Sequence, residues 1–355
     1  MAKDIPIQNV YYLLCYAWEQ MREGEVVDVG EAGRTDLTDL FAQVLAEGTK
    51  RILRQGLDRG YVSHREDTSR IRGRIDFSTS LKRALFPRAQ AHCQYDELSR
   101  NVLHNQILRS TIRLLIRVED LDGDLKNTLR GLDRRLSGID TVPLNGLVFR
   151  QVQLHAGNAF YRFLMNVCDL IQRNTFAQDK GEGQRFRDFL QDEATMWKLF
   201  EEFVYNFYRH EQSRFEVSRP EIAWDLDEPK PADGVSTEGN VRLPTMKTDV
   251  VLQSGDQKII IDTKFYTDTL QSNHGNQSYH SANLYQLFTY LKNAEARGDT
   301  YMDAEGILLY PTVSYPLDDQ VWIQGHKIRV RTLNLAQKWK AIEQDLKALI
   351  GLHDT

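Results

Sequence analysis

The stretch TDVVLQSGDQKIIIDTK, residues 248–264, determines how the second half of this chain folds. Runs of β-branched residues flank a Gly-Asp pair within residues 254–257, and this pattern predicts two β-strands joined by a tight turn. With the turn centred there, Asp249 lies opposite Asp262, because both are equally far from its centre. Lys264 follows Asp262 by two residues, so the two side chains share one face of the strand.

Two facing carboxylates repel each other and weaken a hairpin unless a cation lies between them. A divalent metal meets that requirement, and Mg²⁺ prefers oxygen ligands. We therefore expect Asp249 and Asp262 to bind Mg²⁺, with the main-chain carbonyl of Thr263 as a third ligand. Lys264 would hold the attacking water or a phosphate oxygen, as metal-dependent phosphodiester cleavage requires. The alternative is a surface hairpin with exposed charges, in which Lys264 is only an ion-pair partner.

The helix expected after the hairpin carries polar residues that could extend this site. Within residues 281–297, Asn283, Gln286 and Tyr290 share one helical face. Gln286 is the candidate to contact phosphate or to orient Lys264, and a role outside the site is equally open for it.

The helix expected over residues 193–211 offers a further acid through Glu201 or Glu202. Either could supply a metal-linked carboxylate, although acids on a solvent-facing helix surface give the same pattern. The helix also has aromatic residues at helical spacing, which we interpret as core packing. They are Trp197, Phe200, Phe203, Phe207 and Tyr208.

The composition is that of an ordinary soluble globular protein, with 41% hydrophobic and 27% charged residues. A length of 355 residues predicts about two domains. The turn-rich residues 138–148 place the boundary near residue 150, which gives domains 1–150 and 151–355. A net charge of −5 argues against a protein that coats DNA by bulk charge.

One segment is strongly basic: residues 50–90 contain eleven Lys and Arg residues against four Asp and Glu residues. Period-two alternation predicts strands at 61–64 and 70–77, and Gly73 within the second predicts a bulge or a close backbone approach. The arginines of that strand, Arg70, Arg72 and Arg74, are candidates for contact with phosphate or an acidic partner. A solvated charged face is the other interpretation.

Several classes of protein are disfavoured by what the sequence lacks. Three scattered cysteines form neither a disulfide framework nor a zinc-site pattern, which suits a reducing cytoplasm. The apolar run 10–18 is too short to span a membrane. Neither a P-loop nor a Gly-x-Ser-x-Gly motif occurs, so we expect no nucleotide bound by this chain and no serine-hydrolase site.

The expected elements follow one another in an α/β order, with a mixed α+β first domain. Outside the hairpin and the segments above, the sequence predicts helices at 10–18, 36–55, 99–118, 124–136, 159–173 and 335–350, and strands at 306–310 and 327–333.

The chain resembles the McrC family, the nuclease subunits of modification-dependent McrBC restriction systems. The hairpin is similar to the PD-(D/E)xK nuclease motif, with Asp249 as the first acid and Asp262-Thr263-Lys264 as D-x-K. Thr248 stands where the name of that motif has proline, and this leaves the metal-binding acid in place. Further similar motifs are IPIQNVYYLL (5–14), YAW (16–18), GRIDF (73–77), DELS (96–99), NQIL (105–108) and NLYQL (283–287) with Tyr290.

The resemblance implies a restriction-endonuclease-like PD-(D/E)xK domain over 151–355 and a partner-binding domain over 1–150. It implies a Mg²⁺-dependent endonuclease that cuts double-stranded DNA containing modified cytosine. The cutting would require a McrB-like AAA+ GTPase hexamer, whose GTPase activity the first domain would stimulate. Arg70, Arg72 and Arg74 would serve this docking or contact DNA. The alternative is a non-catalytic adaptor that activates an AAA+ GTPase and keeps a vestigial nuclease fold.

Overall fold

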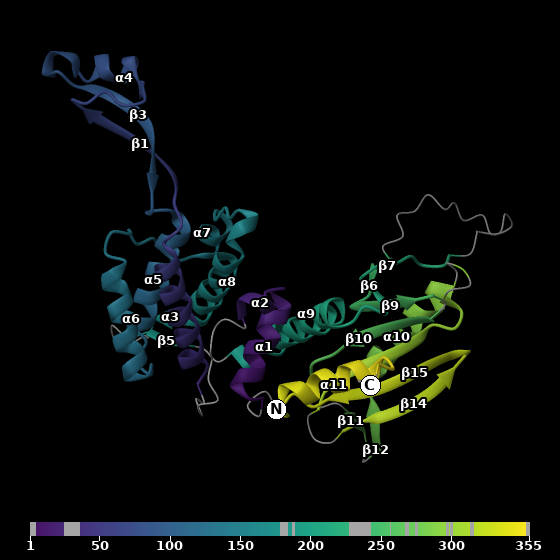
Figure 1. Ribbon diagram of the computed structural model, residues 1–355. Coiled ribbons are helices and arrows are strands. Elements are labelled where there is room, and N and C mark those ends of the chain that lie inside the picture. The colour runs from purple at the N-terminus through teal and green to yellow at the C-terminus, as the bar shows by residue number, and fades with distance from the viewer. Residues whose placement is uncertain are drawn as a thin grey trace, which may run out of the picture. The chain divides into compact units, whose positions relative to one another are not determined.

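The computed structural model describes residues 5–24, 36–177, 184–186, 189–226, 243–255, 257–266, 270–273, 276–295, 298, 301–312 and 316–352. The chain forms two compact units (Figure 1). Unit 1 combines Met1–Met21 with Phe189–Thr355, and unit 2 is Arg22–Asp188. Each unit is described by itself below.

Unit 1 is built on a six-stranded mixed sheet in the order β14-β15-β13-β10-β9-β6. β10, β13 and β15 run parallel to one another. β14 is antiparallel to β15, β9 is antiparallel to β10, and β6 is antiparallel to β9. The bounds are β6 (Glu216–Ser218), β9 (Val250–Ser254), β10 (Gln257–Thr263), β13 (Glu305–Pro311), β14 (Asp318–Ile323) and β15 (His326–Leu333).

The hairpin predicted from the sequence is the β9–β10 pair, and its register is confirmed. Ser254 pairs with Gln257 across the turn, and Val250 pairs with Ile261 at the other end. Gly255 has a φ of +55°, a left-handed conformation that glycine adopts without steric cost. One step beyond the last pair, the same register places Asp249 opposite Asp262.

Helices cover both faces of this sheet, which confirms the α/β class expected for the second half. On one face, α10 (Ser281–Glu295) packs Leu287 and Leu291 into a buried cluster with Ile260 and Leu308. α9 (Glu193–Glu211) contacts β10 and β6. Six of the seven residues of β10 are buried, as a strand covered on both faces requires.

The first helix, α1 (Ile7–Ala17), belongs to unit 1 and not to an N-terminal domain as expected from the sequence. The side-chain amide of Asn9 donates to the carbonyls of Leu335 and Gln337 at 2.8 and 2.7 Å. The ring of Tyr16 lies 5.6 Å from the rings of Phe203 in α9 and Trp339 in α11 (Trp339–Leu349). Burial of this aromatic surface therefore ties the N-terminus to the C-terminal sheet.

Unit 2 contains a bundle of four helices: α3 (Leu37–Gln55), α5 (Leu103–Ile116), α6 (Gly123–Arg135) and α8 (Ala159–Asn174). All four lie close to the positions expected from their apolar spacing. α8 packs against α3 and α5, so the compact unit extends beyond the boundary expected near residue 150. The turn-rich residues before α8 connect two packed helices and do not separate two domains.

A three-stranded antiparallel sheet in the order β1-β3-β2 extends from these helices together with α4 (Figure 1). Its elements are β1 (Gly60–Thr68), β2 (Arg74–Ile75), α4 (Phe77–Lys82) and β3 (Ala91–Ser99). The strand expected over 70–77 is wrong except for Arg74–Ile75. Asp76 ends it, because its side chain accepts from Thr79 N at 3.0 Å and caps α4.

The remaining elements are short. They are α2 (Met21–Gly24), η2 (Phe86–Arg88), α7 (Gly146–Arg150), η3 (Ala156–Asn158), β4 (Thr175–Ala177), β5 (Gln184–Phe186), η4 (Phe189–Gln191), β7 (Glu221–Ile222), β8 (Met246–Lys247), β11 (Leu270–Asn273) and β12 (Asn276–Tyr279). Among the described helices, none has the length and apolar character needed to cross a membrane.

Gly73 provides a direct test of the close backbone approach that the sequence predicted. Its φ is +59°, and a Cβ atom there would lie 2.4 Å from the carbonyl oxygen of Gln94 in β3. We expect Gly73→Ala to destabilise the β2–β3 pairing by about 1–3 kcal/mol. Hydrogen exchange of the β3 amides measures the effect. Gly131→Ala in α6 is the matched control, since a Cβ there meets nothing within 4 Å. Equal protection in both variants would contradict the prediction.

Candidate active site

The end of the hairpin gathers three charged side chains in the interior of unit 1. Asp249, Asp262 and Lys264 are 9%, 0% and 5% exposed. The Nζ atom of Lys264 lies 2.8 Å from Oδ2 of Asp262. The exposed surface hairpin considered from the sequence is therefore wrong, although Lys264 is indeed an ion-pair partner. Burying an acid pair with one lysine is costly, and this indicates a functional constraint.

The two acids differ in how their oxygens are satisfied. Oδ2 of Asp249 accepts hydrogen bonds from the main-chain N and the Oγ1 of Thr263, at 2.7 and 2.8 Å. Oδ1 of Asp262 is buried and has no hydrogen-bond partner among the described residues. Its Oδ2 lies 2.8 Å from Nζ of Lys264, with which it forms an ion pair. Asp262 thus has oxygen lone pairs available for a cation.

Burial raises the pKa of Asp262 to about 7, with Asp249 and Glu201 adding to the effect and Lys264 opposing it. Burial alone would lower the pKa of Lys264, but the adjacent Asp262 outweighs it, so the net shift is upward. Lys264 is therefore charged at neutral pH, whereas Asp262 is close to its titration point. A positive ion beside Asp262 would favour its ionised form.

Both candidate acids on α9 lie near Arg219, whose guanidinium is 2.8 Å from Oε1 of Glu202 and 3.9 Å from Oε1 of Glu201. Burial raises the pKa of Glu201, and the negative charge of Asp249 adds to this shift. Arg219 also donates from Nε to the main-chain oxygen of Asp249 at 2.8 Å, so it links α9 to the start of the hairpin.

Lys264 opens onto a pocket of about 350 Å³ between the N-terminal part of α9 and α10. Gln286 lines the same pocket, and its Nε2 donates to Tyr290 Oη at 2.6 Å. Asn283 also lines it and donates to Tyr310 Oη at 3.0 Å. The structure thus brings Lys264 and Gln286 to one cavity, with no hydrogen bond between them among the described contacts.

Trp197 is a member of this site that the sequence assigned to core packing. The other four aromatic residues of its stripe are buried, whereas Trp197 is 42% exposed and lines the pocket. Its Nε1 donates to the carbonyl of Thr263 at 3.1 Å, and its ring centre lies 5.7 Å from Lys264 Nζ. Its position four residues before Glu201, and so on the same helical face, was the signal that could have identified it.

The donor set fits a hard cation held partly by water. Among the described residues, no three Asp, Glu, His or Cys side chains converge closely enough to hold a metal by themselves. Mg²⁺ usually binds through one or two carboxylates and keeps several waters. Asp249 and Asp262 match that pattern. The Thr263 carbonyl accepts from Trp197, and a carbonyl oxygen has a second lone pair for another contact.

The three arginines singled out by the sequence lie in unit 2, whereas the acids lie in unit 1. Arg70, Arg72 and Arg74 are exposed. The guanidinium carbon of Arg72 lies 5.6 Å from the ring centre of Tyr95. Within unit 2 these residues belong to the β1-β3-β2 sheet and the loop before β2.

The raised pKa of Asp262 predicts a specific pH dependence of stability. An unfolded Asp titrates near 3.8, so the folded chain holds this proton more tightly between about pH 4 and about pH 7. The resulting loss of free energy of unfolding is absent at about pH 4 and complete at about pH 8. We therefore expect the free energy of unfolding of the parent to fall, relative to that of Asp262→Asn, which stays neutral, by on the order of 2–4 kcal/mol from the lower pH to the higher.

Denaturant unfolding of both proteins across this pH range, with chelator present, measures the difference. The exposed Asp225→Asn serves as the control and should change neither limit. The same change in the free energy of unfolding across this pH range in the parent and in Asp262→Asn would contradict the prediction.

The chain is similar to known proteins. The family model described as "McrBC 5-methylcytosine restriction system component" matches residues 7–311. The chain is 31% identical over 343 residues to the type IV methyl-directed restriction enzyme EcoKMcrBC of Escherichia coli (strain K12), covering 96% of each protein.

A solved structure is similar in fold. It is the Thermococcus gammatolerans half-complex of McrB AAA+ hexamers with bound McrC, with a TM-score of 0.60 and 17% identity, covering 97% of this chain and 75% of the solved chain. The family match and the Escherichia coli relative together show that the chain belongs to the family of McrBC 5-methylcytosine restriction system components.

Proposed function

We propose that this chain is the Mg²⁺-dependent endonuclease subunit of a modification-dependent restriction complex. The observation that carries the proposal is the buried group of Asp249, Asp262 and Lys264, in which Asp262 has oxygen atoms without hydrogen-bond partners. A buried carboxylate of this kind is costly in a purely structural role. A bound cation would offset that cost and give the group a function.

The fold that we propose for unit 1 is that of PD-(D/E)xK nucleases. The support is local: an acid precedes β9, and Asp-x-Lys ends β10, in a mixed sheet with helices on both faces. α9 carries Glu201, whose pKa is raised by burial and by the charge of Asp249, and α10 brings Gln286 to the pocket of the lysine. The parts of the motif are therefore supplied by two neighbouring strands and two helices.

Asp249 and Asp262 would hold Mg²⁺, which when bound would polarise the phosphodiester and favour deprotonation of water. The charged Lys264 would contact a phosphate oxygen or the attacking water. Glu201, with its raised pKa, could accept a proton from that water. Gln286 would donate to a phosphate oxygen from the far side of the pocket, while Trp197 fixes the Thr263 carbonyl.

We further propose that the chain acts with a McrB-like AAA+ GTPase hexamer on double-stranded DNA containing modified cytosine, in the cytoplasm. The solved relative is a complex of McrB AAA+ hexamers with McrC, and the Escherichia coli relative is methyl-directed. The sequence contains no P-loop, which fits a division of labour in which the partner hydrolyses GTP. Unit 2 would dock the hexamer and stimulate its GTPase, with Arg70, Arg72 and Arg74 as candidate contacts to the hexamer or DNA.

The second candidate is a non-catalytic adaptor that activates an AAA+ GTPase. The intact charges favour the nuclease, because an adaptor would have no need to retain Asp262 and Lys264 fully buried in one ion pair. The two proposals differ in whether these side chains are needed for cutting or only for folding.

A cleavage assay distinguishes the two. With the AAA+ partner, GTP and Mg²⁺ on a duplex carrying modified cytosine, we expect Asp262→Asn and Lys264→Ala to lower the cleavage rate by roughly a hundredfold or more. Stimulation of the partner's GTPase should persist, which excludes misfolding. Lys247→Ala is the matched control, because this lysine lies in neighbouring β8 with an exposed side chain. Undiminished cutting by both site variants would support the adaptor instead.

Metal binding has a readout independent of cleavage. A cation that binds Asp249 and Asp262 only in the folded state should stabilise the chain by about 1–2 kcal/mol at roughly tenfold excess over its dissociation constant. We expect Mg²⁺ to raise the unfolding temperature of the parent and not that of Asp249→Asn or Asp262→Asn. An equal rise in all three proteins would place the ion elsewhere.

A further inference from the structure

Unit 2 contains a second polar feature, on the helices α5 and α6. Two adjoining pockets of about 520 and 630 Å³ share Arg113 and Arg117, which lie one turn apart on α5. The second pocket is also lined by Arg130 and Arg134, one turn apart on α6. Four arginines from two packed helices and the C-cap of α5 thus line these two adjoining pockets, which together we call the arginine groove.

The charge of the arginine groove is not neutralised within unit 2. Asp133 is the only acid that lines either pocket among the described residues, and it already pairs with Arg109 at 2.8 Å. In the described part of the chain, Arg113, Arg117 and Arg134 have no acidic partner, and Arg130 bonds only to the amide oxygen of Asn127. The groove therefore presents a concentrated positive charge to solvent.

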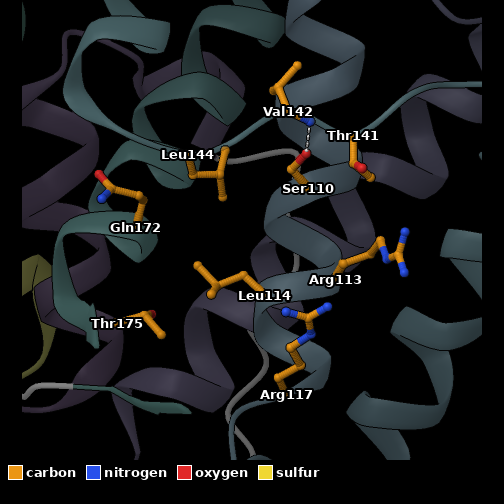
Figure 2. A pocket seen from close by; sticks show the side chains of 9 residues that line it. All are labelled: Ser110, Arg113, Leu114, Arg117, Thr141, Val142, Leu144, Gln172 and Thr175. Carbon is orange, nitrogen blue, oxygen red and sulfur yellow. Dashed lines mark hydrogen bonds between the residues drawn. The ribbon is translucent and has the colours of Figure 1, made fainter. Parts of the chain in front are cut away.

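The wall of the groove is held in place by hydrogen bonds. Ser110 Oγ accepts from the main-chain N of Val142 at 2.8 Å, which fixes the chain after α6 against α5. Arg109 donates to the carbonyl of Ile139 from the same side of α5. Figure 2 shows Arg113 and Arg117 on one side of the first pocket and Gln172 with Thr175 across it. The hollow is thus a formed feature with polar groups opposite the arginines.

We propose that the arginine groove binds the phosphate backbone of DNA, an inference that rests on the proposed nuclease function. Guanidinium groups bind phosphate oxygens in bidentate geometry and suit this role better than ammonium groups. Pairs of arginines one turn apart, on two neighbouring helices, match an extended row of anions better than a single small one. Phosphate contacts carry no sequence information, so the groove holds DNA while other parts of the complex select it.

The test is equilibrium binding of the full chain to a fluorescein-labelled duplex of about 30 base pairs, with chelator to exclude metal-dependent contacts. We expect Arg113→Gln with Arg117→Gln to weaken binding roughly tenfold at moderate salt and to reduce the slope of log K against log salt by about 2. The loss should be equal on modified and unmodified duplexes. Arg113→Lys with Arg117→Lys keeps the charge and should retain most of the affinity.

The matched control is Arg135→Gln with Arg150→Gln, which removes two exposed arginines of unit 2 outside the groove. We expect its affinity to equal that of the parent, with equal unfolding temperatures in all variants. Unchanged affinity in the groove variant would overturn the proposal. So would unchanged DNA affinity together with lost association with the AAA+ partner, since the groove would then bind an acidic protein surface.

This outcome is separate from that of the nuclease proposal. If the groove variant binds DNA as tightly as the parent, the groove proposal fails and the assignment of Asp262 and Lys264 as the cleavage site stands. If Asp262→Asn cuts as fast as the parent, the nuclease assignment fails and the effect of Arg113 and Arg117 on DNA binding stands.

Discussion

The burial of Asp262 beside Lys264 is the constraint on which unit 1 depends. The carboxylate is inaccessible to water, and it forms a 2.8 Å ion pair with Lys264. Such a group is tolerated only where surrounding structure holds its partner at a fixed distance. The parallel ladder does this, since the main-chain N of Lys264 donates to Leu309 O at 3.0 Å, one residue beyond the end of β10.

The second support of the site is α9, which reaches it from the opposite direction. The C-terminal part of this helix is fixed by Phe203, Phe207 and Tyr208, all fully buried, and by the contact of Tyr16 from α1. Earlier in the same helix, Trp197 donates to the carbonyl of Thr263, and the pKa of Glu201 is raised by burial and by the charge of Asp249. The N-terminal helix of the chain therefore contributes to the geometry of acids that lie more than two hundred residues later.

The local parts of this arrangement followed from sequence alone. Alternation and the Gly-Asp turn gave the register that places Asp249 opposite Asp262, because hairpin pairing depends only on the turn and the period of two. Helical spacing offered Gln286 on the helix after the hairpin as a candidate, and it left the choice between Glu201 and Glu202 open. The strand at 70–77 was wrong because the cap formed by Asp76 competes with strand alternation, and β3 was missed because its solvent-exposed half lacks an apolar face.

Sequence by itself determined the hairpin, the candidate acids and the helices, since each depends on neighbours within a few residues along the chain. Tertiary structure alone decided that Glu201 and Glu202 both lie near Arg219, with Glu202 closer to its guanidinium, because Arg219 lies outside α9. It also decided that α1 belongs with the C-terminal sheet and that α8 belongs with unit 2. These outcomes depend on long-range burial of side chains, which has no signature in local periodicity.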